Sequence, residues 1–153
     1  ISAGLYYTFW FPGLWLPCFV FPGLKDVPLP LKRHLRFACA TTKRLARELF
    51  LNMLIYQQRL ESKQNILSRF VDIGTDLFVI SAACSYAASL VKQKDSHSGA
   101  SPVELADLFC CQARARIARN FKDVWHNHDK TLKAVSKNLM AGGYEWLENE
   151  IIK

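Results

Sequence analysis

The chain has 153 residues, of which 50% are apolar and 22% are charged. This length and composition suffice for one domain with a hydrophobic core, and they exclude disordered, collagen-like and low-complexity chains. The 5 cysteines are too sparse for a small disulfide scaffold. The first residue is Ile rather than Met, which favours a fragment of a longer chain.

The net charge of +7 is concentrated in one part of the chain. Residues 1–24 carry no charge, residues 25–60 carry an excess of +6, and residues 61–153 are nearly balanced. Overall basicity alone would favour nucleic acid as the partner. An apolar aromatic block followed directly by a basic helix is more typical of a protein at an anionic membrane surface.

Residues 1–30 are predicted to be an aromatic segment and linker. Pro12, Pro17 and Pro22 argue against a regular transmembrane helix, because each removes a backbone N–H and the freed carbonyls lack partners in hydrocarbon. No basic region precedes the apolar run, so it does not fit a secretory signal. Trp10 and Trp15 suit the headgroup level of a bilayer. Packing of these aromatics on another domain of a longer chain is an equally good interpretation.

A helix is predicted over residues 31–60, because apolar residues recur there at helical spacing. They are Leu31, Leu35, Ala38, Leu45, Leu49 and Met53. Cations populate the other side: Lys32, Arg33, Arg36, Lys43, Arg44 and Arg47. They form either a surface for anionic lipid or a solvated helix face. The residues expected at a membrane surface are therefore Trp10, Trp15, Lys32, Arg33, Arg36, Lys43 and Arg44.

A second helix is predicted over residues 62–92. Beyond Asp76 it is apolar on nearly every side, which is typical of a helix buried between neighbours. Gly74 lies inside it at a cost of about 1 kcal/mol relative to Ala, which a close approach of another helix would explain.

Three further helices are predicted after the polar loop 95–100. Ser101 and Glu104 form a capping box with Pro102 at the first helical position, and this helix runs to residue 125. Its expected inward residues are Leu105, Phe109, Ala113, Ile117, Phe121 and Val124. Asp129 is expected to cap a helix through Met140, which Gly142 and Gly143 end. The last helix, over residues 144–152, is expected to turn Trp146, Leu147 and Ile151 inward.

No stretch shows sustained strand alternation. The fold class is therefore all-α, an antiparallel helical bundle of four to five helices over residues 31–153, preceded by the proline-punctuated aromatic segment 1–30.

Nothing in the sequence forms a self-sufficient active site, and no catalytic, cofactor-binding or metal-binding residue is predicted. No glycine-rich phosphate loop, nucleophile elbow or zinc-protease motif is present. The adjacent Cys110 and Cys111 are best explained as small packing residues. His126, His128 and Asp129 lack a fourth ligand nearby. The pair Asp72 and Asp76 is expected to bridge to arginines of the third helix, namely Arg114, Arg116 and Arg119.

Several runs of the chain are similar to one enzyme family. They are KRLARELFLNML at residues 43–54, RLESKQNILSRFVDIGTDLFVISAACSYA at 59–87, LADLFCCQARARIARN at 105–120 and AGGYEWLENEIIK at 141–153. Together they resemble the C-terminal helical extension of acyl-CoA dehydrogenases of the large, very-long-chain type. The resemblance covers roughly residues 31–153 and rests on packing patterns rather than on catalytic motifs.

The resemblance implies a parent flavoenzyme of fatty-acid β-oxidation. Such enzymes bind FAD and use a glutamate base to remove the α-proton of an acyl-CoA, while a hydride passes from the β-carbon to the flavin. No residue here matches that glutamate or the FAD-binding segments, so this chain is expected to be catalytically silent alone and to hold no cofactor. The implied partners are the dehydrogenase core of the same chain, a second copy in a homodimer, and an anionic membrane surface.

The implied location is peripheral, on the matrix side of the mitochondrial inner membrane or on a bacterial cytoplasmic membrane. The alternative is a stand-alone peripheral membrane or scaffold protein. Nucleic acid is not expected as a partner, because residues 31–47 lack interleaved aromatics and a docking motif.

Overall fold

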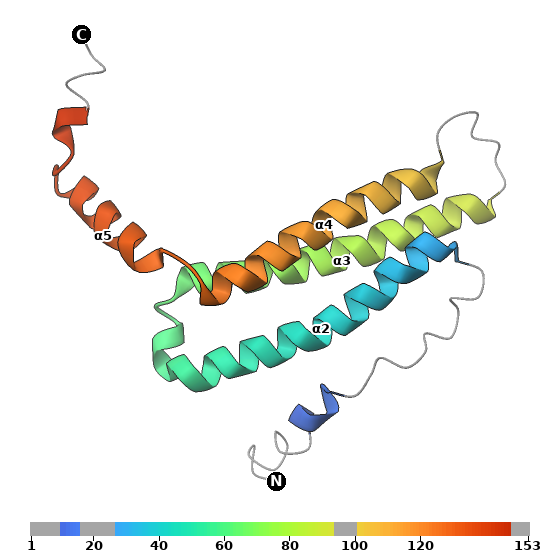
Figure 1. The fold of residues 1–153 in the computed structure, drawn as a ribbon, viewed down its shortest axis with the longest axis horizontal. Helices are drawn as coiled ribbons and strands as arrows, with labels where there is room; N and C mark the ends of the chain where they lie inside the picture. Colours follow the sequence, from blue (N-terminus) through green and yellow to red (C-terminus); the bar gives the residue numbers. More distant parts are fainter. Residues whose placement is uncertain (1–9, 16–26, 94–100, 148–153) are drawn as a thin grey trace.

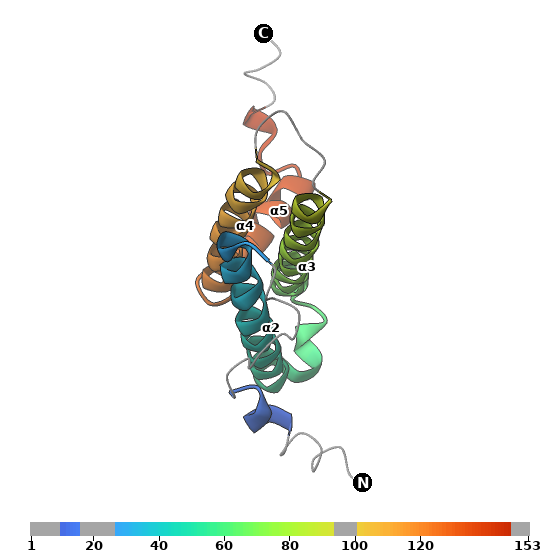
Figure 2. The same ribbon diagram turned by 90° about the vertical axis from the view of Figure 1, so that its right-hand side faces the viewer.

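The computed structural model of the chain describes residues 10–15, 27–93 and 101–147. All regular structure in these ranges is helical, which confirms the all-α class. Three long helices, α2 (Leu29–Tyr56), α3 (Gln64–Lys92) and α4 (Pro102–Trp125), lie side by side as a bundle (Figures 1 and 2). Consecutive helices are antiparallel, so α2 and α4 run in the same direction.

Helix α2 begins and ends earlier than the pattern predicted. Pro28 occupies the cap and Pro30 lies in the first turn, where a missing N–H breaks no hydrogen bond. The helix ends at Tyr56, and the short 3₁₀ helix η2 (Gln57–Leu60) replaces the final turn predicted for α2. Gln57 has a φ of 47°, a left-handed conformation that stops an α-helix.

At the start of α4 and of α5 (Asp129–Met140), the observed capping differs from the prediction. Ser101 Oγ accepts a hydrogen bond from the backbone N–H of Val103 at 3.3 Å, not from that of Glu104 as expected. Asp129 is the first residue of α5 rather than its cap. The Asn127 side chain accepts from the Asp129 N–H at 3.2 Å, which leaves the Asp129 carboxylate for another partner.

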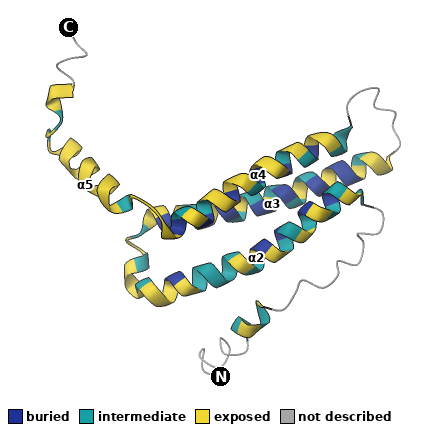
Figure 3. Cartoon of the chain, viewed as in Figure 1, coloured by how far each residue is buried: buried dark blue, intermediate teal, exposed yellow. Residues whose placement is uncertain are grey.

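The core is the seam where α3 meets α2 and α4. Figure 3 shows the buried residues along the facing sides of these three helices. Helix α3 contributes a row at helical spacing that consists of Ile66, Phe70, Ile73, Leu77, Ile80 and Cys84. Helix α4 contributes Ala106, Cys110, Ala113, Ile117, Phe121 and Val124. Ala106, Cys110 and Ala113 are small, so the packing of α4 on α3 depends on small side chains there.

Several residues predicted to face inward are exposed. Met53 and Leu105 lie at the edges of their helices' apolar stripes, and both face solvent. Helix α3 is not buried all round, because Val71 and Phe78 lie on a side that neither α2 nor α4 covers. Trp146 and Leu147 are exposed as well, while Ile151 lies outside the described residues.

Helix α5 leaves the end of the bundle instead of joining it (Figure 1). None of its residues is buried. The bundle itself therefore consists of α2, α3 and α4. The last predicted helix appears over residues 145–147, and the rest of it lies outside the described residues.

We expect Gly74→Ala to raise the free energy of unfolding by about 1 kcal/mol, because Ala is the better helix former. A Cβ at Gly74 would meet only Leu45 Cδ2, at 3.9 Å, which is ordinary contact. The close helix approach expected at Gly74 is thus absent. Urea denaturation followed by circular dichroism measures the change.

Gly142→Ala is the matched control. Gly142 has a φ of +77°, and a Cβ there would lie 2.7 Å from Glu145 Oε1. This substitution should destabilise the turn after α5. A loss of stability in Gly74→Ala would mean that α2 and α3 are closer than described.

Candidate functional site

The membrane-surface candidates on α2 do not form one free basic face. Arg33 and Arg36 are exposed, whereas Lys32 and Lys43 are half-buried. Arg44 lies over the Phe121 ring of α4, with 4.1 Å between the guanidinium carbon and the ring centre. Its position between two helices makes it a packing residue.

The described part of the aromatic segment packs on α2. Residues 10–13 form a helical turn, and the Trp10 and Phe11 rings lie 6.2 and 4.9 Å from the Phe50 ring. Trp15 is 68% exposed and lies 4.6 Å from the Arg47 guanidinium. Arg47 also donates to the Leu14 carbonyl oxygen at 2.6 Å. These contacts favour packing on protein for residues 10–15.

A series of polar contacts joins α2 to α4 along their shared side. Besides Arg44 on Phe121, the Arg114 guanidinium lies 4.3 Å from the Phe37 ring centre. Trp125 Nε1 donates to Glu48 Oε2 at 2.8 Å. The partners follow in the same order on both helices, as expected for parallel neighbours. Part of the charge on α2 therefore serves helix packing.

The groove between α3 and α4 on the side away from α2 has a polar end. Arg116 reaches Asp76 with N–O distances of 2.6 to 3.2 Å, which confirms the expected Arg–Asp bridge. The hydrogen bonds that Arg116 donates to Asp76 raise the pKa of the Arg116 guanidinium above its ordinary value. Asp72 and Arg119 line the pocket beside this pair.

The other end of this groove is apolar and open. A pocket of about 370 Å³ lies between Tyr86 and Leu90 of α3 and Leu105 and Phe109 of α4. Tyr86 and Leu105 are 67% and 72% exposed. Such a run of large apolar side chains indicates a surface that another protein segment or lipid covers. The sequence pattern missed it because it placed Leu105 in the core and predicted the second half of α3 to be buried on nearly every side.

Helix α3 is also long and apolar enough to cross a membrane by length and composition. A core helix of a bundle meets the same criteria. Packing of α3 against α2 and α4 accounts for part of its apolar character, since 33% of the apolar window is buried in the bundle.

Helix α5 is attached to the bundle by a bidentate ion pair between Arg69 and Asp129. Arg69 of α3 donates to both carboxylate oxygens of Asp129, at 2.7 and 2.8 Å. These hydrogen bonds hold the pKa of Asp129 below its ordinary value. Beyond this anchor, Leu132, Val135 and Leu139 form an exposed apolar stripe. The three lysines of α5 lie on the opposite side: Lys130, Lys133 and Lys137.

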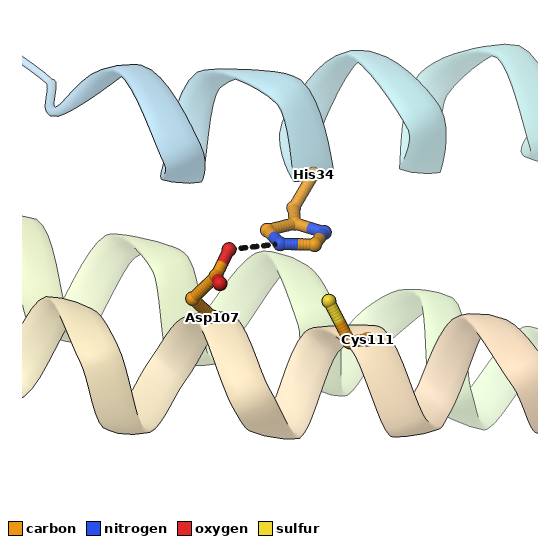
Figure 4. A group of neighbouring side chains, drawn as sticks. All are labelled: His34, Asp107 and Cys111. Atoms are coloured by element: carbon orange, nitrogen blue, oxygen red, sulfur yellow. Dashed lines mark hydrogen bonds and ion pairs between the residues drawn. The ribbon is translucent and has the colours of Figure 1, made fainter.

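One group of metal-ligating side chains lies elsewhere in the described residues, between α2 and α4 (Figure 4). His34 is 2% exposed, and its Nε2 lies 2.8 Å from Asp107 Oδ1. Cys111 follows Asp107 by one helical turn and points to the same place. No local sequence pattern marks this group, because its members come from two helices and His34 and Asp107 are 73 residues apart.

The histidines considered for metal binding in the sequence take no part in this group. His128 is the residue before α5, and the neighbouring Asp129 carboxylate is held by Arg69. His126 and His128 therefore lie at the junction of α4 and α5, apart from the group of His34, Asp107 and Cys111.

The chain matches the family described as ACAD9/ACADV, C-terminal domain, over residues 34–144. It is also 38% identical over 148 residues to the probable acyl-CoA dehydrogenase FadE10 of Mycobacterium bovis and of two strains of Mycobacterium tuberculosis. The alignment covers 93% of this chain but 22% of those proteins. No solved structure matches significantly. The chain belongs to the ACAD9/ACADV C-terminal domain family, as its sequence resemblance indicated.

We expect Asp129→Asn to lower the free energy of unfolding by about 1 kcal/mol at neutral pH, because it removes a partly buried ion pair. The lowered pKa of Asp129 means that this contribution is complete above the ordinary carboxyl pKa of about 4. It is lost as the pH falls through the lowered pKa. The two proteins should therefore begin to converge in stability below about pH 4 and become equal only below the lowered pKa of Asp129.

Thermal denaturation across this pH range tests the effect, and hydrogen exchange should show faster exchange in α5. Asp72→Asn, which changes an exposed carboxylate of α3, is the control. Equal stability of Asp129→Asn and the parent at neutral pH would show that the bridge does not anchor α5.

Proposed function

We propose that the chain is the C-terminal helical domain of an FAD-dependent acyl-CoA dehydrogenase of fatty-acid β-oxidation. It serves dimer architecture and membrane attachment and is catalytically silent alone. The similarity to an acyl-CoA dehydrogenase across 93% of the chain carries this proposal. The low coverage of the relatives supports placing the catalytic core, and with it FAD, outside this chain.

The described residues do not fit an FAD site. The apolar pocket between α3 and α4 is lined by alanines, Leu90, Pro102, Leu105, Phe109 and Tyr86, and it offers no cation for a pyrophosphate. Arg116, at the polar end of the groove, is committed to Asp76. This chain therefore contributes surfaces rather than chemistry.

The exposed apolar groove suits the dehydrogenase core of the same protein. Burial of side chains such as Tyr86 and Leu105 would be favourable by about 1.5–3 kcal/mol each. The adjoining Asp76–Arg116 pair would supply a polar rim, as at other protein interfaces. A homodimer would use the surfaces that the core leaves uncovered.

Helix α5 suits an anionic membrane surface better than α2 does. It has an apolar stripe on one side and lysines on the other, the pattern of a helix that lies in a bilayer interface. On α2, Arg44 and Arg47 are used by aromatic neighbours. We place the domain peripherally on a bacterial cytoplasmic membrane or on the matrix side of the mitochondrial inner membrane. The mycobacterial relatives favour the first.

The enzyme proposal predicts that the full-length protein purifies with bound FAD and that acyl-CoA bleaches the flavin absorbance. The 153-residue chain alone should carry no flavin and leave acyl-CoA unchanged. Flavin that co-purifies stoichiometrically with the isolated chain would contradict this division. A full-length protein without flavin would remove the enzyme assignment.

The membrane proposal predicts that the chain sediments with vesicles containing anionic lipid and not with zwitterionic vesicles. Lys130, Lys133 and Lys137 each contribute about 1 kcal/mol near such a surface. Changing all three to Glu should abolish binding, while Lys32, Arg33 and Arg36 changed to Glu should weaken it less. Binding that survives the α5 changes and is lost with the α2 changes would move the contact to α2. Binding unaffected by either set would contradict the proposal.

A further inference from the structure

We propose that His34, Asp107 and Cys111 form a zinc-binding site on the seam between α2 and α4. The ligand atoms of these three residues all lie within 4.8 Å of one another (Figure 4). The proposal does not depend on the dehydrogenase assignment, since it rests on side chains within this domain alone.

The geometry is close to what a tetrahedral zinc ion requires. Zinc bonds of about 2.0–2.3 Å place the ligand atoms of such a site about 3.3–3.8 Å apart. His34 Nε2 and Asp107 Oδ1 are already 2.8 Å apart, so the ion would spread this pair slightly and draw the Cys111 sulfur inward. Asp107 and Cys111 stand one turn apart on α4, where two side chains share a face.

The donor set also matches zinc. An imidazole nitrogen, a carboxylate oxygen and a thiolate are the three kinds of ligand that zinc takes in proteins. The thiolate and carboxylate together neutralise the charge of the ion. His34 is buried and held in place, whereas Asp107 and Cys111 are accessible to solvent. Three protein ligands leave a fourth position for water.

The neighbouring Cys110 cannot replace Cys111. Its sulfur lies in the core, 3.7 Å from that of Cys84. Cys110 is fully buried, so its sulfur faces the core rather than the seam where His34, Asp107 and Cys111 meet. The two adjacent cysteines are therefore a matched pair for testing the site.

Arg114 should limit the affinity of the site. Its Nη1 lies 3.5 Å from His34 Nδ1, which favours the tautomer with the proton on Nε2. Zinc at Nε2 requires the proton on Nδ1 and an acceptor beside it. Arg114→Gln removes this donor and its charge and should tighten zinc binding, by up to about tenfold.

Cobalt(II) titration of the 153-residue chain under reducing conditions is the direct test. Cobalt occupies zinc sites and produces a near-ultraviolet absorption band when a thiolate binds it. We expect one equivalent to bind, with this band present in the parent protein and in Cys110→Ser. The band should be absent in Cys111→Ser. Asp107→Asn should weaken binding by more than about tenfold.

Zinc should also raise the melting temperature of the parent chain, because the ion binds the folded state and bridges two helices. Circular dichroism checks that each variant is folded, and Cys111→Ser changes only an exposed side chain. No thiolate band in the parent, or the same band in Cys111→Ser, would overturn the proposal. A band lost only in Cys110→Ser would also overturn it.

Discussion

Burial of one face of α3 against both α2 and α4 is the constraint on which the rest of the structure depends. The row from Ile66 to Cys84 recurs at helical spacing, so a single stripe supplies most of the core. Small residues of α4, such as Ala113 and Cys110, allow close packing along this stripe. With α3 central, α2 and α4 become parallel neighbours on the same side of it, and their side chains meet along a second seam.

Because of this second seam, the charged residues of α2 do not all face outward to form one lipid-binding surface. The guanidinium of Arg44 lies over the Phe121 ring, and that of Arg114 lies over the Phe37 ring. Glu48 accepts a hydrogen bond from the indole N–H of Trp125. A guanidinium over an aromatic ring keeps its outer nitrogens hydrated while its flat face covers apolar surface. The same seam brings His34 to Asp107 and Cys111, so the metal-ligating group is a consequence of how two helices pack.

The surfaces left uncovered are consistent with a domain that belongs to a larger enzyme. The chain spans about a fifth of the length of its mycobacterial relatives, which are probable acyl-CoA dehydrogenases. Large apolar side chains remain exposed in several places of the described chain, among them the α3/α4 groove and α5. A self-contained domain of this size would normally bury more of them. The groove has a polar rim suited to protein, and α5 has lysines suited to lipid headgroups.

The sequence by itself determined the all-α class, the extents of α3 and α4 to within a few residues, the Asp76–Arg116 bridge and the family. These follow from helical periodicity, capping residues and spacing, all of which act locally along the chain. Only the tertiary structure decided which apolar side chains are buried, since Leu105 lies on the predicted inward face of α4 and is nevertheless exposed. Whether a stripe is covered depends on how many helices pack around it, and the departure of α5 leaves one side open. The group of His34, Asp107 and Cys111 was likewise beyond sequence reasoning, since no local pattern records which residue of α4 lies opposite a given residue of α2.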